Sequence, residues 1–308
     1  MSKSSDALLS PPPPLVTVRD FVRWGASAFA RAGLVFAHGT DNALDEAFHL
    51  TLWALKLPAD LPATYLEAAL TDSERAAVWA LLNERIESRR PAAYLIGEIQ
   101  FCGLPFTVDE RVLIPRSPIG EMIQQQFLPW LTVPPQRILD LCAGSGCIGI
   151  ACAQAFTEAA VDLAELDTGA LAVAQANIDR HGCGEQVQAY ASDLFAGLPP
   201  DARYELIVSN PPYVPTAEVD ALGPEFRHEP RMALEAGADG MDIVERLLRQ
   251  APQYLTEDGL LVCEIGGSQQ EFFARFPDLP VSWPEFERGG DGVFLIGRRE
   301  LLHWSQQR

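Results

Sequence analysis

The sequence has little positive charge. Its 308 residues carry 23 Lys and Arg against 42 Asp and Glu, a formal net charge of −19. Residues 1–90 are nearly balanced, whereas residues 91–308 hold 14 basic and 31 acidic side chains, a net charge of −17. Proteins that bind duplex nucleic acid need clustered cationic side chains that contact the phosphates. The balance therefore argues against direct binding of duplex DNA and favours a small-molecule or basic protein partner.

Long hydrophobic runs and paired cysteines are also missing. No apolar run reaches the roughly 18 residues that a membrane-spanning helix needs, and the first residues contain no hydrophobic signal core. The six cysteines form no C-x-x-C pair, and the five histidines are scattered. We therefore expect a cytoplasmic protein with no membrane partner, no disulfide framework and no bound metal.

The chain divides into four predicted segments. Residues 1–14 end in a Pro run, which indicates a flexible arm. Residues 15–92 carry three patterns with helical periodicity, of which the last begins with the capping box Thr71–Glu74 and is stopped by Pro91. Residues 93–118 contain alternating apolar positions around Cys102-Gly103, which predicts a linking β-hairpin. The helical domain is therefore expected at 15–92, the hairpin at 93–118 and the main domain at 119–308.

The main domain alternates short apolar runs with helical segments. This rhythm predicts a Rossmann-like, doubly wound α/β fold with a mostly parallel sheet. Near the end, Val281–Glu287 and Val293–Gly297 flank the glycine-rich residues 289–292. We expect these two runs to form an antiparallel hairpin that completes a sheet of seven strands.

A glycine-rich turn follows the first strand of this domain. The run Ile138–Gly149 has the order strand, turn and helix, and glycine lets the backbone approach a ligand closely. Glu165 ends the next strand, 21 residues after Gly144, where its carboxylate can accept hydrogen bonds from ribose hydroxyls. The spacing of the glycines alone does not separate NAD from S-adenosylmethionine. Asp140 favours the latter, because its charge suits an ammonium group and repels a pyrophosphate.

The second motif is Asn210-Pro211-Pro212-Tyr213, directly after an apolar strand. In a doubly wound sheet this position is the carboxyl end of a strand, where ligands bind. The prolines stiffen the turn and supply no N–H. The Asn210 carboxamide and the Pro211 carbonyl are then presented as two acceptors, which suits a planar NH₂ group. Pro212 and Tyr213 would complete the wall of that pocket.

Together these residues resemble the class I S-adenosylmethionine methyltransferases that modify planar nitrogens, and in particular the HemK-like protein-(glutamine-N5) methyltransferase family. The likeness extends from about residue 15 to the end of the chain and includes residues 93–97, 101–103 and 108–116. Pro115-Arg116-Ser117-Pro118 and the ending Trp283–Phe294 are similar to the branch that methylates a glutamine of large-subunit ribosomal protein L-three. Glu165 departs from the Asp that is common in relatives.

The resemblance implies roles for matched residues. Gly144, Ser145 and Gly146 would line the methionine end of S-adenosylmethionine, and Asp193-Leu194 would contact its adenine. Asn210, Pro211 and Tyr213 would hold the substrate glutamine during methyl transfer, which leaves S-adenosylhomocysteine as product. Phe101 would help to wall the glutamine pocket, although packing in the hairpin core is an equally good interpretation.

Several interpretations stay open at this stage. The favoured one is methylation of a glutamine in the ribosomal protein, which is basic and is met free or during ribosome assembly. Methylation of the glutamine of peptide chain release factors is the alternative, and adenine-N6 methylation of nucleic acid fits less well because of the −17 charge. A binding module that holds the cofactor without transferring methyl groups is the third possibility.

Overall fold

The computed structural model describes residues 15–287 and 289–306, and the predicted Pro-rich arm 1–14 lies outside them. The contacts divide the chain into two compact units. One holds the N-terminal region up to Glu98 together with Gly223–His228, and the other holds Ile99–Leu222 and Glu229–Arg308. The short segment Gly223–His228 therefore leaves the second unit and returns to it, which the sequence did not indicate.

The first unit is helical. The capping box of Thr71 and Glu74 is present, and the helix that it starts ends at Ser88, as predicted. Buried apolar residues from the three long helices form one core, among them Phe21, Leu50 and Leu82. Its helices are α1 (Val18–Arg31), α2 (Ala43–Ala54), η2 (Ala63–Glu67), α3 (Asp72–Ser88), α4 (Ala92–Ile96) and η3 (Pro224–His228).

Three buried charged side chains, Glu46, Arg85 and Glu225, and the partly exposed Arg89 form a cluster within the helical unit. Arg85 of α3 donates from Nε to Glu46 Oε1 at 2.8 Å, and its Nη1 lies 3.9 Å from Glu225 Oε1. Glu225, from the Gly223–His228 segment, also pairs with Arg89 at 2.7 Å and accepts the Val35 N–H at 3.1 Å. Buried charges of this kind are tolerated only when paired, so Glu225 fixes its segment to the helices.

The second unit is built on a six-stranded sheet in the order β5-β4-β3-β6-β7-β8. Neighbouring strands run parallel except for β8, which is antiparallel to β7. This arrangement confirms the predicted α/β fold with a mostly parallel sheet. The strands are β3 (Arg137–Leu141), β4 (Ala160–Glu165), β5 (Val187–Ala191), β6 (Tyr204–Ser209), β7 (Leu255–Glu264) and β8 (Val293–Gly297).

The prediction of a seventh strand at Val281–Glu287 is wrong. Only Ser282 pairs there, in an isolated antiparallel bridge with Leu295 in which each N–H donates to the other carbonyl at 2.9 Å. Pro280 and Pro284 flank this bridge, and proline has no N–H to donate to a ladder. The prolines therefore prevent this run from forming a strand.

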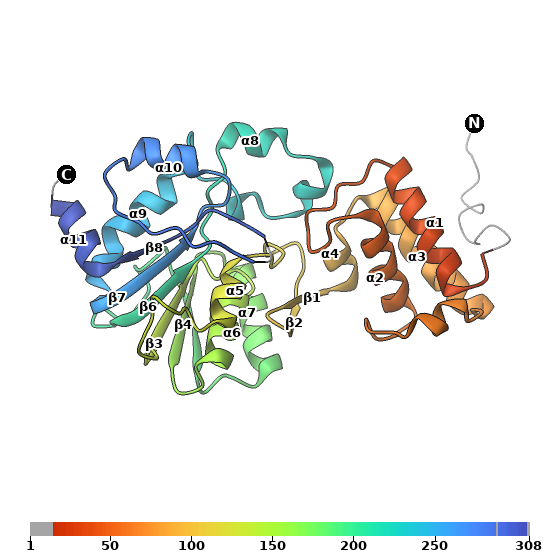
Figure 1. The fold of residues 1–308 in the computed structure, drawn as a ribbon, viewed down its shortest axis with the longest axis horizontal. Helices are drawn as coiled ribbons and strands as arrows, with labels where there is room; N and C mark the ends of the chain where they lie inside the picture. Colours follow the sequence, from red (N-terminus) through yellow and green to blue (C-terminus); the bar gives the residue numbers. More distant parts are fainter. Residues whose placement is uncertain (1–14, 288, 307–308) are drawn as a thin grey trace. The chain divides into compact units, whose positions relative to one another are not determined.

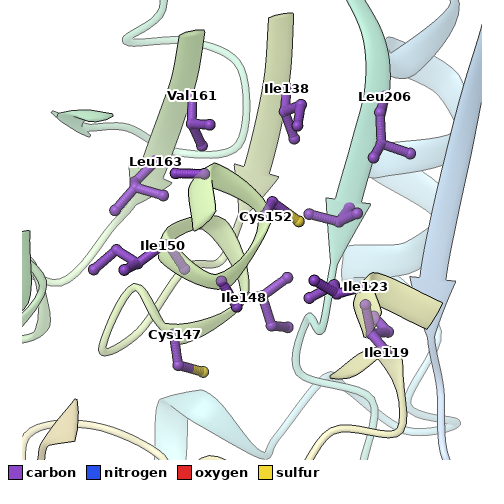
Figure 2. Packing of buried hydrophobic residues seen from close by; sticks show 14 of the residues in the cluster. Ile119, Ile123, Ile138, Cys147, Ile148, Ile150, Cys152, Val161, Leu163 and Leu206 are labelled. Carbon is purple, nitrogen blue, oxygen red and sulfur yellow. The ribbon is translucent and has the colours of Figure 1, made fainter. Parts of the chain in front are cut away.

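Helices cover both faces of the sheet (Figure 1). Helices α5 (Ile119–Gln124), α6 (Cys147–Ala155) and α7 (Thr168–His181) pack on one face, where Ile148 and Ile150 meet Ile138 and Leu163 of the strands (Figure 2). The other face is covered by α9 (Asp242–Gln250), η5 (Ala251–Gln253), α10 (Gln269–Arg275) and α11 (Arg298–Gln306). Both sides of a parallel sheet must be buried in this way.

The predicted hairpin is also present. It consists of β1 (Glu98–Phe101) and β2 (Leu104–Thr107), joined at Cys102-Gly103, both with positive φ. Asn177 of α7 holds β2, because its carboxamide accepts the Thr107 N–H at 2.8 Å and donates to the Thr107 carbonyl at 3.1 Å. The remaining elements are α8 (Thr216–Ala221) and η4 (Arg231–Ala233), which follow β6.

Candidate active site

A cavity of about 650 Å³ lies at the carboxyl ends of the strands, entirely within the second unit. The sequence motifs supply one part of its lining, from residues 142–148, 164–170, 192–194 and 210–212. The other part comes from residues 111–117, 230–237 and 243–246. The position is the one where doubly wound sheets bind their ligands.

The glycine-rich turn leads from β3 into α6. Gly146 has a φ of +77° and precedes the first residue of the helix, and Gly144 has a φ of +54°. A Cβ on Gly144 would have no other atom within 4 Å, whereas a Cβ on Gly149 would lie 2.1 Å from Leu163. Gly144 therefore keeps the turn open toward the cavity, while Gly149 allows α6 to pack closely on the sheet.

Glu165 sits at the end of β4 and lines the cavity, as the sequence predicts. Its Oε2 accepts the Gly144 N–H at 2.8 Å, and its Oε1 accepts the Asp167 N–H at 2.9 Å. These bonds hold the carboxylate in place beside the turn. Each oxygen keeps a lone pair with which to accept a further hydrogen bond.

Asp140 lies one layer behind the cavity lining. Its Oδ2 accepts the Gly149 N–H at 2.8 Å, and its Oδ1 is buried without a hydrogen-bond partner among the described residues. Burial, with a smaller contribution from Glu165, raises the pKa of Asp140 to about 8. Its predicted role toward an ammonium group stays a prediction.

Asp193 and Leu194 follow β5 and line the same cavity. Both Asp193 oxygens accept from Nη2 of Arg246 at 2.8 Å. Arg246 and Ile243 of α9 also line the cavity, and the sequence reasoning missed them. Ile243 and Arg246 are three residues apart on a predicted helix, about one helical turn, and this spacing is the signal that could have placed them on a shared face.

The Asn-Pro-Pro-Tyr turn leaves β6 after Ser209, whose hydroxyl donates to the Leu141 carbonyl at 2.8 Å. Asn210 and Pro212 line the cavity. The Asn210 carboxamide makes no hydrogen bond with any other described residue, so its oxygen is available to a ligand. The motif thus presents an unused acceptor at the carboxyl end of the sheet, beside the glycine-rich turn.

Other predicted residues stand behind the lining. Pro211 is buried, and the Tyr213 hydroxyl donates to Glu264 Oε1 at 3.3 Å. Phe101 is buried in the core against Phe106 and Gly120, which supports the packing interpretation over a place in the pocket wall. Gly146 likewise does not line the cavity and acts through the path of the turn.

Arg116, which belongs to the motif at residues 115–118, and the 230–237 segment form another part of the wall, and of these two only the segment was not indicated by the sequence. Arg116 donates to both oxygens of buried Glu229, at 2.6 and 2.9 Å. Val214 pairs with Glu235 and receives the Ala236 N–H, which ties the segment to the end of the Asn-Pro-Pro-Tyr turn. Within residues 15–287 and 289–306, no three His, Cys, Asp or Glu side chains gather as metal ligands would.

Residues 124–240 match the family described as Methyltransferase small domain. The chain is 48% identical over 289 residues to the ribosomal protein uL3 glutamine methyltransferase of Xylella fastidiosa (strain 9a5c), covering 94% of this chain and 92% of that protein. It is 47% identical to the protein of the same name from Xanthomonas campestris pv. campestris, with 94% of each chain covered. A crystal structure of a methyltransferase from Pyrococcus furiosus aligns at 17% identity over 64% of this chain and 89% of that one, with a TM-score of 0.46.

Near-complete coverage at this identity shows common descent over both units. The glycine-rich turn, the Glu165 carboxylate and the Asn-Pro-Pro-Tyr turn meet in one cavity of the second unit. The chain belongs to the family of the ribosomal protein uL3 glutamine methyltransferases.

Proposed function

We propose that this protein transfers a methyl group from S-adenosylmethionine to the side-chain amide nitrogen of a glutamine in ribosomal protein uL3. The observation that carries the proposal is the unused Asn210 carboxamide, which shares one cavity with the glycine-rich turn and Glu165. An amide NH₂ group needs acceptors, and a nucleoside needs a carboxylate for its ribose. The cavity provides both.

The residues fit S-adenosylmethionine. Gly144 has no Cβ and leaves open space beside the turn for a ligand. Asp140 Oδ1 is a buried acceptor without a partner among the described residues. Gly144, Ser145 and Asp140 would hold the methionine end, Glu165 the ribose, and Asp193 with Leu194 the adenine. When bound, the cofactor supplies an activated methyl group on a sulfonium, whose leaving group is a neutral thioether and needs no general acid.

The work of the protein is to position the nucleophile. The lone pair of an amide nitrogen is delocalised into its carbonyl, so the nitrogen is a weak nucleophile. Asn210 Oδ1 and the Pro211 carbonyl would each accept a hydrogen bond from one N–H group of the glutamine amide. These two hydrogen bonds would hold the amide nitrogen toward the methyl group. Orientation and fixed dipoles of this kind supply several kcal/mol of barrier lowering.

The charge of the chain supports a basic substrate. Residues 91–308 carry a net charge of −17, and this range contains the whole of the unit with the cavity. Opposite charge raises the rate at which a basic protein meets such a surface. None of the described helices is both long and apolar enough to cross a membrane.

The test is methyl transfer from labelled S-adenosylmethionine to separated components: ribosomal proteins, release factors and DNA. We expect label in uL3, at the side chain of a glutamine that mass spectrometry of its peptides identifies. Label in the release factor alone would move the activity to the related branch. Cofactor binding with no transfer to any component would make the protein a binding module.

A further inference from the structure

The end of β7 carries a buried carboxylate that the methyl-transfer scheme does not use. Glu264 is the last residue of β7 and is almost completely buried. It does not line the cavity, but it lies directly behind two segments that do. Its Oε1 accepts the Tyr213 hydroxyl at 3.3 Å, and its Oε2 accepts the Ser117 hydroxyl at 2.5 Å.

We propose that Glu264 is a positioning residue for the glutamine amide, acting through the Tyr213 ring on the turn that presents Asn210 and Pro211. The inference rests on the proposed function, because it concerns the same nucleophile. Glu264 does not touch the reacting atoms. It ties the last residue of the Asn-Pro-Pro-Tyr motif to the sheet.

The Tyr213 ring is also fixed on its side. Gly266 has a φ of +48°, and a Cβ there would lie 2.8 Å from the Tyr213 hydroxyl and from its ring edge. Gly292 in turn contacts Gly266, since its own added Cβ would fall 1.8 Å from the Gly266 carbonyl. The ring therefore packs against a backbone that has no side chain at either glycine. The Tyr213 carbonyl accepts the Ser268 hydroxyl at 3.1 Å.

The chemistry of the carboxylate explains why a Glu stands there. Two hydroxyl donors converge on it, and the Ser117 oxygen also accepts the Ile119 N–H at 3.1 Å. A carboxylate has two oxygens and accepts a hydrogen bond from both hydroxyls. A carboxamide has only one acceptor oxygen, so one hydroxyl would have to accept a hydrogen bond from the amide NH₂ group instead of donating one. Burial raises the pKa of Glu264 to about 7, and the hydrogen bonds from Ser117 and Tyr213 and the charge of Arg116 oppose that rise.

The experiment compares Glu264→Gln and Tyr213→Phe, alone and together, with Tyr204→Phe as a matched control. Tyr204 also donates to a carboxylate, Asp162 Oδ2 at 2.7 Å, but at the opposite end of β6 from Asn210. For each variant, we would measure kcat and KM for uL3, the affinity for S-adenosylhomocysteine, and hydrogen exchange of the Tyr213 and Val214 amides.

We expect Glu264→Gln to lower kcat about 10- to 100-fold. KM and S-adenosylhomocysteine affinity should stay within threefold, and the two amides should exchange faster. Adding Glu264→Gln to Tyr213→Phe should change kcat by less than twofold further, because both act through one contact. The Tyr204→Phe variant should keep its kcat.

Unchanged kcat and unchanged exchange in Glu264→Gln would overturn the inference, as would fully multiplicative losses in the double variant. An equal loss of kcat in Tyr204→Phe would show a general effect of weakened packing. A wild-type protein that leaves uL3 unmethylated would refute the proposed function instead. The exchange of Tyr213 and Val214 would still decide whether Glu264 orders the turn.

Discussion

Removing Glu225 should loosen the helical unit far more than removing a surface carboxylate. Glu225 has no exposed side-chain surface, faces Arg85 and Arg89, and accepts the Val35 N–H. The charges of these four side chains cancel, so the variant Glu225→Ala leaves one net positive charge in the cluster. Breaking a buried ion pair by removing one partner costs about 3–5 kcal/mol.

We expect the lower end of that range. Arg89 is partly exposed and keeps its hydrogen bonds to the carbonyls of Ala32 and Gly33, while Arg85 keeps Glu46. A loss of about 3 kcal/mol corresponds to local opening that is roughly a hundredfold more frequent. Native-state hydrogen exchange of α2 and α3 measures it directly.

The control is Glu67→Ala. Glu67 pairs with Arg19 in the same unit, but the two side chains are 61% and 59% exposed, so the pair contributes at most about 1 kcal/mol. Exchange rates in Glu225→Ala that stay within threefold of those in Glu67→Ala would refute the reasoning. Glu225→Gln, which keeps an acceptor for Val35 without the charge, should fall between the two.

Four further results should follow. Asn210→Ala should lower kcat about 100-fold or more with S-adenosylhomocysteine affinity changed only a few-fold, and near-normal turnover would remove its assigned role. Gly149→Ala should lower the free energy of unfolding by about 1–3 kcal/mol in denaturant titrations, because its Cβ would overlap Leu163, and an unchanged midpoint would contradict this. Methylation of uL3 should lose kcat/KM as ionic strength rises, whereas a flat profile would limit the acidity to solubility. Folding raises the pKa of Asp140 from 3.8 to about 8, so its contribution to stability is complete below pH 3.8 and is lost as the pH rises toward 8. The variant Asp140→Asn should therefore flatten the pH dependence of Tm between these two values. An unaltered slope would count against the pKa shift.

Local patterns predicted most of the second unit. The alternation of apolar runs with helical segments predicted the mostly parallel sheet, and the glycine and proline motifs gave the turns that follow β3 and β6. These elements depend on neighbouring residues, on backbone freedom at Gly144 and on missing N–H groups at Pro211 and Pro212. The same kind of reasoning failed at Val281–Glu287, where Pro284 interrupts the run and supplies no N–H for a strand.

What the sequence could not predict depends on contacts between distant residues. Arg246 meets Asp193 across 53 positions, and Glu264 meets Ser117 across 147. Tyr213 was expected to face the ligand. The ring packs against Gly266 instead, because its hydroxyl is directed to a carboxylate that only the assembled sheet brings near.

The excursion of Gly223–His228 limits how the protein can be recombined. Three peptide bonds join the two units, at residues 98–99, 222–223 and 228–229. A chimera that exchanges only the N-terminal helices would keep Glu225 but remove Arg85 and Arg89, so the buried acid would face foreign partners. The helical unit and this six-residue segment must therefore be exchanged together if these ion pairs are to be kept.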